Sequence, residues 1–195
     1  MRKKEPLSFL LDALRNLIKW LRAGRIQGVI IGGVAASILG RPRMTRDIDA
    51  LILLTEDYWV RFLLDGAKFG FVPRLSNCIE FAKKSRVLLV RHKPSGIDVD
   101  IAFGALGFEK ETIDRAVWVK LKNTRLPLPT PEDLIIMKAI ARRPRDIADI
   151  ESILDAHPKL DRRRVRRWVK EFSEAVAMPE ILEDMEKMLA RKRKR

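Results

Sequence analysis

Two aspartates at alternate positions, Asp47 and Asp49, stand at the start of an apolar run that ends at Leu54. The run is predicted to be a buried strand, in which residues i and i+2 point to the same face. The two carboxylates are therefore expected to lie side by side next to a hydrophobic core, where like charges repel and desolvation is costly. A divalent cation is the simplest compensation. The pattern thus predicts a strand with a charged, cation-binding end.

A glycine pair lies upstream of this strand. Residues 29–37 predict a second strand that ends at Gly32-Gly33 and continues into a helix. Such a turn leaves backbone N–H groups available to hold an anion. Any tight turn would also use glycine, so the pair alone decides little. Beside a pair of carboxylates, it indicates a phosphate cradle and hence nucleotide chemistry.

A second pair of aspartates repeats the same spacing. Residues 86–92 and 97–103 are predicted to form a β-hairpin, and its second strand carries Asp98 and Asp100. Three carboxylates from adjacent strands match the hard-oxygen site that Mg²⁺ prefers. A calcium loop is disfavoured because such loops are polar and rich in Gly and Asn. A site with two ions would activate an attacking hydroxyl and stabilise leaving pyrophosphate.

The chain after Pro129 has a wholly helical pattern. Thr130, Pro131 and Asp133 supply an N-cap, a proline at the first helical position and an acid at the third. We therefore expect two domains: a mixed α/β part with an N-terminal helix over residues 1–128, and a C-terminal helical lobe over 129–195. The lobe is expected to pack on the first domain, with the functional site at their junction.

The helical lobe carries further charged candidates. Lys138 is the only charge in residues 134–141, and it would either extend to the surface or neutralise a triphosphate. Arg142 and its neighbours Arg143 and Arg145 would bind phosphates. Asp146 and Asp149 have a structural interpretation as acids of a helix N-terminus.

The overall composition limits the class of protein. The chain has 40 Lys+Arg against 26 Asp+Glu, a net charge of +14, which favours polyanionic partners or simply a soluble surface. The single cysteine, Cys78, excludes an internal disulfide and fits a reducing cytoplasm. The longest uncharged run, residues 26–40, is shorter than the ~18 residues that a membrane span needs. The sequence thus predicts a soluble, cytoplasmic protein without a membrane segment.

Several short motifs along residues 27–154 share the residue types and order of one known superfamily. They are Gly32-Gly33, Arg43-x-Thr45-x-Asp47-x-Asp49, Val99-Asp100-Ile101, Lys138, and Arg145-Asp146-x-x-Asp149. Together they resemble the motif series of the nucleotidyltransferases. The similarity is greatest to the AbiEii/MenT-like branch of minimal nucleotidyltransferases, known from toxin–antitoxin and phage-abortive systems.

The resemblance implies an α/β (α+β) fold, with a mixed β-sheet core flanked by helices. It implies Mg²⁺, as one or two ions and replaceable by Mn²⁺, held by Asp47, Asp49 and Asp100. The activity would be transfer of a nucleoside monophosphate from an NTP, such as ATP, to an acceptor hydroxyl. The residues that it assigns to the nucleotide are Gly32, Gly33, Arg43, Thr45 and Lys138.

The resemblance leaves two residue choices open. Asp100 matches the single third acid of the family better than Asp98, which would support the site or face water. Many members carry Gly-Ser in the first motif, whereas this chain has Gly33 at the second position. A hydroxyl contact to phosphate would then come from Thr45 or Ser37.

The same resemblance implies that the acceptor is RNA, such as the 3′ end of tRNA, and that the protein is a toxin with an antitoxin partner. Two alternatives are kept. A non-catalytic module would bind RNA or a partner through the basic run 162–167 and the tail 191–195, although that run also fits a solvated helix face. An enzyme that transfers AMP to a protein hydroxyl is the other.

Overall fold

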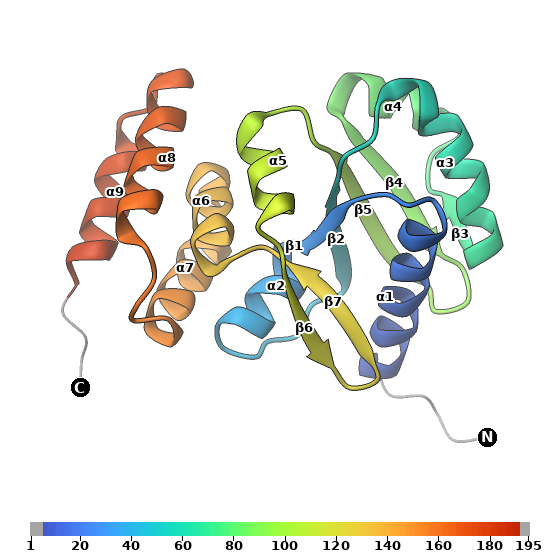
Figure 1. Ribbon diagram of the computed structural model, residues 1–195, viewed down its shortest axis with the longest axis horizontal. Helices are drawn as coiled ribbons and strands as arrows, with labels where there is room; N and C mark the ends of the chain where they lie inside the picture. The colour runs from blue at the N-terminus through green and yellow to red at the C-terminus, as the bar shows by residue number, and fades with distance from the viewer. Residues whose placement is uncertain (1–5, 192–195) are drawn as a thin grey trace. The chain divides into compact units, whose positions relative to one another are not determined.

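The structure is a computed structural model that describes residues 6–191 (Figure 1). The chain divides into two compact units, each with its own core. The first comprises Met1–Val34 and Met44–Leu128, and the second comprises Ala35–Arg43 and Pro129–Arg195. The chain passes from one unit to the other after Val34, which lies within a short helix, after Arg43, and after Leu128. The sequence placed residues 35–43 in the first domain, whereas the structure groups them with the C-terminal helices.

The first unit contains a mixed sheet and surrounding helices (Figure 1). Its elements are α1 (Pro6–Ala23), β1 (Gly28–Ile31), the start of α2 (Gly32–Leu39), β2 (Asp47–Ile52), η1 (Glu56–Tyr58), α3 (Trp59–Gly66), η2 (Ala67–Phe69), β3 (Phe71–Pro73), α4 (Cys78–Ser85), β4 (Val87–His92), β5 (Ile97–Phe103), α5 (Gly107–Asp114), β6 (Val117–Leu121) and β7 (Thr124–Leu128). The expected α/β class with a mixed sheet is confirmed.

The main sheet has five strands in the order β1-β2-β5-β4-β3. β2 and β5 are parallel, and the other neighbouring pairs are antiparallel. The parallel pair is formed by strands far apart in sequence, which requires a crossover connection. In this chain the crossover consists of η1, α3, η2, β3, α4 and β4. It brings the two Asp-x-Asp motifs onto adjacent strands.

One face of the central strands is fully buried. In β2, Ile48, Ala50 and Ile52 point to one face and have no exposed surface, whereas Asp47 is exposed and Asp49 half-buried on the other. α1 packs against β2 and β5 and is seen alongside the sheet in Figure 1. Burial of each large apolar side chain contributes about 1.5–3 kcal/mol. The polar face of the same strands is therefore held in place by a rigid core.

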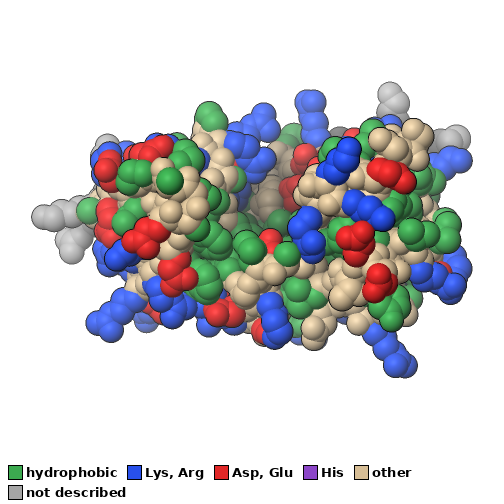
Figure 2. Space-filling view, turned by 90° about the horizontal axis from the view of Figure 1, so that it is seen from above, with side chains coloured by type: hydrophobic (Ala, Val, Ile, Leu, Met, Phe, Trp, Pro, Cys, Tyr) green, Lys and Arg blue, Asp and Glu red, His purple; other side chains and the backbone are tan. Residues whose placement is uncertain are grey.

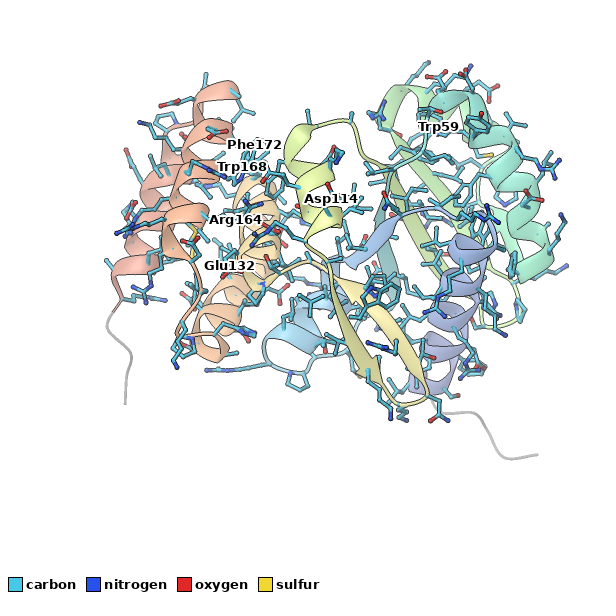
Figure 3. The ribbon with its side chains drawn as sticks, viewed as in Figure 1. Trp59, Asp114, Glu132, Arg164, Trp168 and Phe172 are labelled. Carbon is cyan, nitrogen blue, oxygen red and sulfur yellow. The ribbon has the colours of Figure 1, made fainter. Side chains whose placement is uncertain are left out.

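Stacked aromatic rings join the helices to this core. Trp20 of α1 stacks on Phe62 of α3, with ring centroids 4.0 Å apart, and on Phe71 of β3 at 5.0 Å. Trp59, labelled in Figure 3, stacks on Phe103 at the end of β5 at 4.0 Å. These contacts hold α1 and α3 against the buried face of the sheet.

The structure contains elements of this unit beyond those predicted from the sequence. Residues 117–121 form β6, which pairs only with β7 in a separate two-stranded sheet and does not join the main sheet. Lys122, with a φ of 51°, makes the tight turn between these two strands. Strand β3 and helix α4 were not predicted. β3 is only three residues long, too short to show an alternating pattern.

The second unit is helical, with α6 (Pro131–Ala141), α7 (Pro144–Ala156), α8 (Arg162–Ala175) and α9 (Glu180–Ala190). α6 starts as predicted: the Thr130 hydroxyl accepts a hydrogen bond from the Asp133 N–H at 3.2 Å. α6 packs on α7, α8 and α9. No helix within residues 6–191 is long and apolar enough to cross a membrane.

Residues 35–43 belong to the helical unit because of specific contacts with α7. The Arg41 guanidinium lies 3.0 Å from the Asp155 carboxylate, and the Arg41 N–H donates to the Ser152 hydroxyl. The Leu39 carbonyl lies 2.7 Å from His157 Nε2. These bonds satisfy backbone groups at the end of α2 that have no partner within that helix.

Candidate active site

Four carboxylates lie on one face of the sheet where the parallel strands β2 and β5 begin. Asp47 is opposite Asp98, and Asp49 is opposite Asp100. Opposite residues of paired strands share a face, and so do residues two apart in one strand. The intervening Ile48 and Val99 are fully buried on the other face. The structure therefore brings together the two aspartate pairs that the sequence singled out.

Gly32 lies directly against the Asp49 carboxylate. It has a φ of +61°, a left-handed conformation that favours glycine, and a Cβ added there would be 1.9 Å from Asp49 Oδ2. The preceding residue, Ile31, pairs with Asp49 across β1 and β2. The glycine is thus required both by its backbone angle and by the close approach of the carboxylate. Gly33 follows in the first turn of α2.

The carboxylates have different protein partners. Thr45 donates its hydroxyl to Asp47 Oδ1 at 2.8 Å. Arg91 donates two hydrogen bonds to Asp98, at 2.6 and 3.1 Å. Arg74, just after β3, lies with Nη1 3.1 Å from Asp98 Oδ2 and donates from Nη2 to Asp100 Oδ1. Asp98 is therefore shared by two arginines, whereas Asp100 is paired with Arg74 only through one of its oxygens.

The pKa values of the two acids of β5, Asp98 and Asp100, are shifted in opposite directions. Hydrogen bonds from Arg91 lower the pKa of Asp98, with a further contribution from Arg74. Burial raises the pKa of Asp100, and repulsion from Asp47 and Asp98 adds to it, against the attraction of Arg74. The ionised form of Asp100 is thus disfavoured, first by burial and then by its acidic neighbours. That environment favours a cation or a proton on its carboxylate.

The donor set fits a magnesium ion in its chemistry. Asp47, Asp49 and Asp100 present carboxylate oxygens, the ligand type that Mg²⁺ prefers, from one face of adjacent strands. Within the described part of the chain, no three Asp, Glu, His or Cys side chains are gathered closely enough to hold one ion. Asp47 and Asp100 are instead engaged by Thr45 and Arg74. Shared coordination by these carboxylates stays a prediction.

Lys138 lies in the helical unit, in a buried ion-pair network. Its ammonium is 2.9 Å from Asp146 Oδ1 and 2.8 Å from Asp149 Oδ2, and the residue is only 4% exposed. Arg43 makes a bidentate ion pair with Asp149: its Nε and Nη2 atoms each donate to one carboxylate oxygen at 2.8 Å. Buried charges are tolerated when they are paired in this way. Lys138 is therefore not an ammonium that extends to the surface.

Asp146 and Asp149 are held as anions by these cations. Burial acts to raise the pKa of Asp146, but hydrogen bonds from Arg143 and Lys138 outweigh it and lower the pKa. In the same way, Arg43 and Lys138 lower the pKa of Asp149 despite burial. Asp146 also accepts from the Arg143 N–H at 3.2 Å, at the third position of α7. Asp146 is thus an acid of the helix N-terminus, as expected, whereas Asp149 lies beyond the first turn of α7, so that part of the expectation is wrong.

Comparison with known families assigns the chain. Residues 10–189 match the model of a family described as nucleotidyltransferase of unknown function, DUF6036. The chain belongs to this family. It is therefore a nucleotidyltransferase by family, in agreement with the superfamily resemblance of its motifs. No curated protein matches it.

Solved structures of similar fold support this assignment at the level of architecture. An antigenic nucleotidyltransferase-like protein from Paracoccidioides brasiliensis has 15% identity and a TM-score of 0.54, covering 90% of this chain and 92% of its own. The antibiotic-resistance factor ANT(2'')-Ia has 14% identity and a TM-score of 0.59, covering 88% and 95%. The lincosamide antibiotic adenylyltransferase LnuA has 12% identity and a TM-score of 0.50, covering 79% and 98%. At such identities these likenesses show the fold alone.

Three further predicted phosphate ligands of this nucleotidyltransferase have partners inside the helical unit. Arg142 pairs with Asp184 and Glu180 of α9, and Arg143 pairs with Asp146. Ser37 exchanges hydrogen bonds with the Arg43 backbone, both at 3.1 Å. Each of these side chains has a structural role, and their contact with phosphate stays a prediction.

The basic run of α8 is also largely engaged. Arg164, labelled with Trp168 and Phe172 on the same helix in Figure 3, is buried against Asp133 of α6 at 2.7 Å. Arg162 donates to the Leu189 carbonyl, and Arg166 pairs with Glu186. Figure 2 shows one face of the molecule, on which basic and acidic side chains are interspersed. In the proposed basic tail, residues 192–195 lie outside the described residues.

Sequence reasoning missed the two arginines that hold Asp98 and Asp100. Arg91 pairs with Asp98 across the hairpin formed by β4 and β5, and the hairpin register predicted from the 93–96 turn would have placed them opposite each other. Arg74 follows the unpredicted strand β3, and its N–H donates to the Leu89 carbonyl of β4. No local pattern marks Arg74, because its position depends on a three-residue strand.

Proposed function

We propose that this chain transfers a nucleoside monophosphate from an NTP to an acceptor hydroxyl, with Mg²⁺ held by Asp47, Asp49 and Asp100. The observation that carries the proposal is the register of β2 and β5. It aligns Asp49 with Asp100 on one face of the sheet, with Gly32 against the Asp49 carboxylate. Mn²⁺ has the same preference for carboxylate oxygens and would substitute.

Bound magnesium would polarise the phosphoryl group and neutralise the charge of the leaving pyrophosphate. The protein contributes position and charge. Gly32 lets the Asp49 carboxylate approach the β1–α2 turn, whose following N–H groups at the start of α2 favour an anion. Asp100, opposite Asp49 on the neighbouring strand, would supply a carboxylate oxygen to the ion. Thr45, which donates to Asp47, keeps its proposed role toward the nucleotide. Contact of Arg43 and Lys138 with the nucleotide stays a prediction, because both cations are paired with carboxylates of the helical unit.

For the acceptor we propose RNA, with the 3′ end of tRNA as the first candidate. The net charge of +14 supports a polyanionic partner. Placement in the AbiEii/MenT-like branch, action as a toxin, a neutralising antitoxin and a cytoplasmic location belong to the same proposal. The branch, the toxin role and the antitoxin rest on the motif series Arg43 to Asp49 and Lys138 to Asp149, and the location rests on the single cysteine, Cys78.

A small-molecule hydroxyl is the second candidate acceptor. The fold is similar over most of its length to an antibiotic-resistance factor and to a lincosamide antibiotic adenylyltransferase. A chain that uses the same fold with a small acceptor would need no extended basic surface. Most α8 arginines have partners inside their own unit, which fits this alternative as well.

The test incubates the full chain with each α-labelled NTP and Mg²⁺, in parallel with total RNA, a set of hydroxyl-bearing small molecules, or a protein lysate. Label in RNA supports the first candidate, label in a small molecule the second, and label in protein indicates the AMPylation alternative. Asp49→Asn should abolish transfer. Asp114→Asn is the matched control, because Asp114 is an exposed acid paired with Lys110 on α5 (Figure 3) and its substitution should leave transfer unchanged.

RNA binding without transfer of label, in the wild-type chain and in Asp49→Asn alike, would contradict catalysis and favour the non-catalytic module. Salt dependence adds a second measurement for RNA. Binding through several phosphate contacts should weaken steeply with added salt, whereas salt-independent binding would contradict an electrostatic RNA surface.

A further inference from the structure

We infer that Arg74 is an exchangeable counter-cation of the β5 carboxylates, which competes with the metal ion for Asp100 and stays attached to the sheet through Asp98. The inference rests on the proposed function for the identity of the metal site. It adds a residue that the motif series does not contain.

The geometry gives Arg74 two carboxylate partners. Nη1 lies 3.1 Å from Asp98 Oδ2, and Nη2 donates to Asp100 Oδ1. A guanidinium presents its donors in a fixed fork, so one arginine can bridge two acids that are two residues apart on a strand. Asp100 is the acid expected to coordinate the metal. Arg74 therefore already supplies positive charge at an oxygen that the metal would need.

A metal ion would replace Arg74 more readily at Asp100 than at Asp98. Asp98 also accepts two hydrogen bonds from Arg91, so its charge is compensated within the sheet. Asp100 is paired with Arg74 through one carboxylate oxygen and is also repelled by the charges of Asp47 and Asp98. A divalent cation at Asp100 would replace one hydrogen bond and a single positive charge with a stronger attraction. Asp98 would keep the guanidinium nearby.

The surroundings of Arg74 support a side chain with more than one position. Its Nε–H is buried and has no hydrogen-bond partner among residues 6–191, so the guanidinium is incompletely satisfied where it lies. Its side chain is 23% exposed. Its backbone is fixed by the bond to the Leu89 carbonyl, and Leu89 pairs with Asp100. A movement of the side chain alone would therefore release Asp100.

The exchange also assigns different roles to the two acids of β5. Asp98 would be the anchor of Arg74 and Arg91, whereas Asp100 would be the metal ligand. With a metal ion bound, the Arg74–Asp100 hydrogen bond would be broken and the freed Asp100 oxygen would be available to the ion. Arg74 is thus a positioning residue that lowers metal affinity in the resting chain and prevents unopposed repulsion between the carboxylates.

The test measures Mn²⁺ binding to the full chain by isothermal titration, without nucleotide or acceptor. Removal of the competing charge in Arg74→Gln should tighten Mn²⁺ binding by about tenfold, the order expected for loss of a charged hydrogen bond beside the ligand. Arg91→Gln is the matched control: it removes the same charge from Asp98 but no contact with Asp100, and should change binding by about twofold or less.

A purely structural role would give the opposite sign, because misplacing Asp100 would weaken metal binding. Arg74→Lys provides a second measurement if Arg74→Gln folds poorly. Lysine keeps the charge but lacks the fork, so Mn²⁺ affinity should lie between wild type and Arg74→Gln. Unchanged or weaker binding in Arg74→Gln, relative to Arg91→Gln, overturns the inference.

The inference and the proposed function can fail separately. Tighter Mn²⁺ binding in Arg74→Gln, together with no transfer of label to any acceptor, would support the exchange and contradict the activity. Transfer by the wild-type chain with no gain in Mn²⁺ affinity in Arg74→Gln would support the activity and contradict the exchange. Loss of Mn²⁺ binding in Asp98→Asn but not in Asp100→Asn would reverse the assignment of the two acids and overturn the inference.

Discussion

The two units each contain a cluster of aspartates, but the clusters are compensated in opposite ways. In the helical unit, Asp146 and Asp149 are buried and paired with Lys138, Arg43 and Arg143, and their pKa values are lowered. In the sheet unit, burial and repulsion from neighbouring acids raise the pKa of Asp100. Full internal compensation is typical of a structural network, whereas an incompletely compensated cluster suits binding of an external cation.

The largest expected change in stability comes from a substitution that breaks the buried network of the helical unit. Lys138→Met would leave Asp146 and Asp149 without their shared ammonium and should lower the free energy of unfolding by about 3–5 kcal/mol. Urea unfolding of the full chain measures it. Lys110→Met is the control, because Lys110 makes an exposed pair with Asp114 and should contribute less than about 0.5 kcal/mol. A loss below about 1 kcal/mol in Lys138→Met would contradict a structural role for the network.

The second prediction tests the pH dependence of the same cluster. Asp149→Asn should cost about 2–3 kcal/mol at pH 7, because Lys138 and Arg43 lose a charged partner. A lowered folded-state pKa stabilises the protein above the unfolded pKa, and the contribution is lost as pH falls through the folded value. The difference from wild type should therefore shrink below about pH 4.

Asp155→Asn provides the comparison on the same helix. Asp155 is an exposed acid paired with the exposed Arg41, so its substitution should change stability by less than about 1 kcal/mol. A difference between Asp149→Asn and wild type that stays constant from pH 7 to pH 3 would show that the loss is one of packing and not of charge.

The contrast between the clusters was only partly visible in the sequence. The alternate spacing of Asp47 and Asp49, and of Asp98 and Asp100, predicted which face each pair would share, because the strand period is a local property. The parallel register that aligns the two pairs depends on a crossover of several elements, including the unpredicted β3 and α4. The sequence therefore indicated the acids but not their alignment.

Charge partners were the least predictable feature. Lys138, Asp146 and Asp149 were each singled out, and helical spacing gave Asp146 its place in the first turn of α7. Their meeting in one buried network requires α6 and α7 to pack at a particular angle, set by the αL conformation of Arg142 between them. Arg74 was missed for the same reason, since its two partners lie on a strand more than twenty residues away.

The third prediction sharpens the sheet side of the comparison. Gly32→Ala should lower stability by about 1–2 kcal/mol, through its positive φ and the contact with the Asp49 carboxylate. It should also reduce transfer, because the displaced carboxylate leaves its position. Gly96→Ala is a matched control, with a φ of +72° and no atom within 4 Å of the added Cβ. Thermal unfolding and labelled transfer of both variants separate backbone strain from displacement of Asp49.

Equal losses of stability in Gly32→Ala and Gly96→Ala, with transfer retained in both, would contradict the close approach of Asp49 to the glycine. A larger loss in Gly32→Ala accompanied by loss of transfer would support it. The comparison uses the same substitution at two positive φ values, so the difference between them measures the carboxylate contact.

The smallest expected change in stability is an increase, whereas removal of an acid from the helical unit is expected to decrease stability. Asp100→Asn should raise stability at pH 7, by less than about 1 kcal/mol because the side chain is 40% exposed. A raised folded-state pKa makes the ionised form unfavourable in the folded chain, so the gain should disappear below the unfolded pKa of about 4. Urea unfolding without metal, at pH 7 and pH 3.5, measures it. Destabilisation by Asp100→Asn at pH 7 would mean that the Arg74 pair outweighs burial and repulsion, and Asp100 would then resemble the compensated acids of the helical unit.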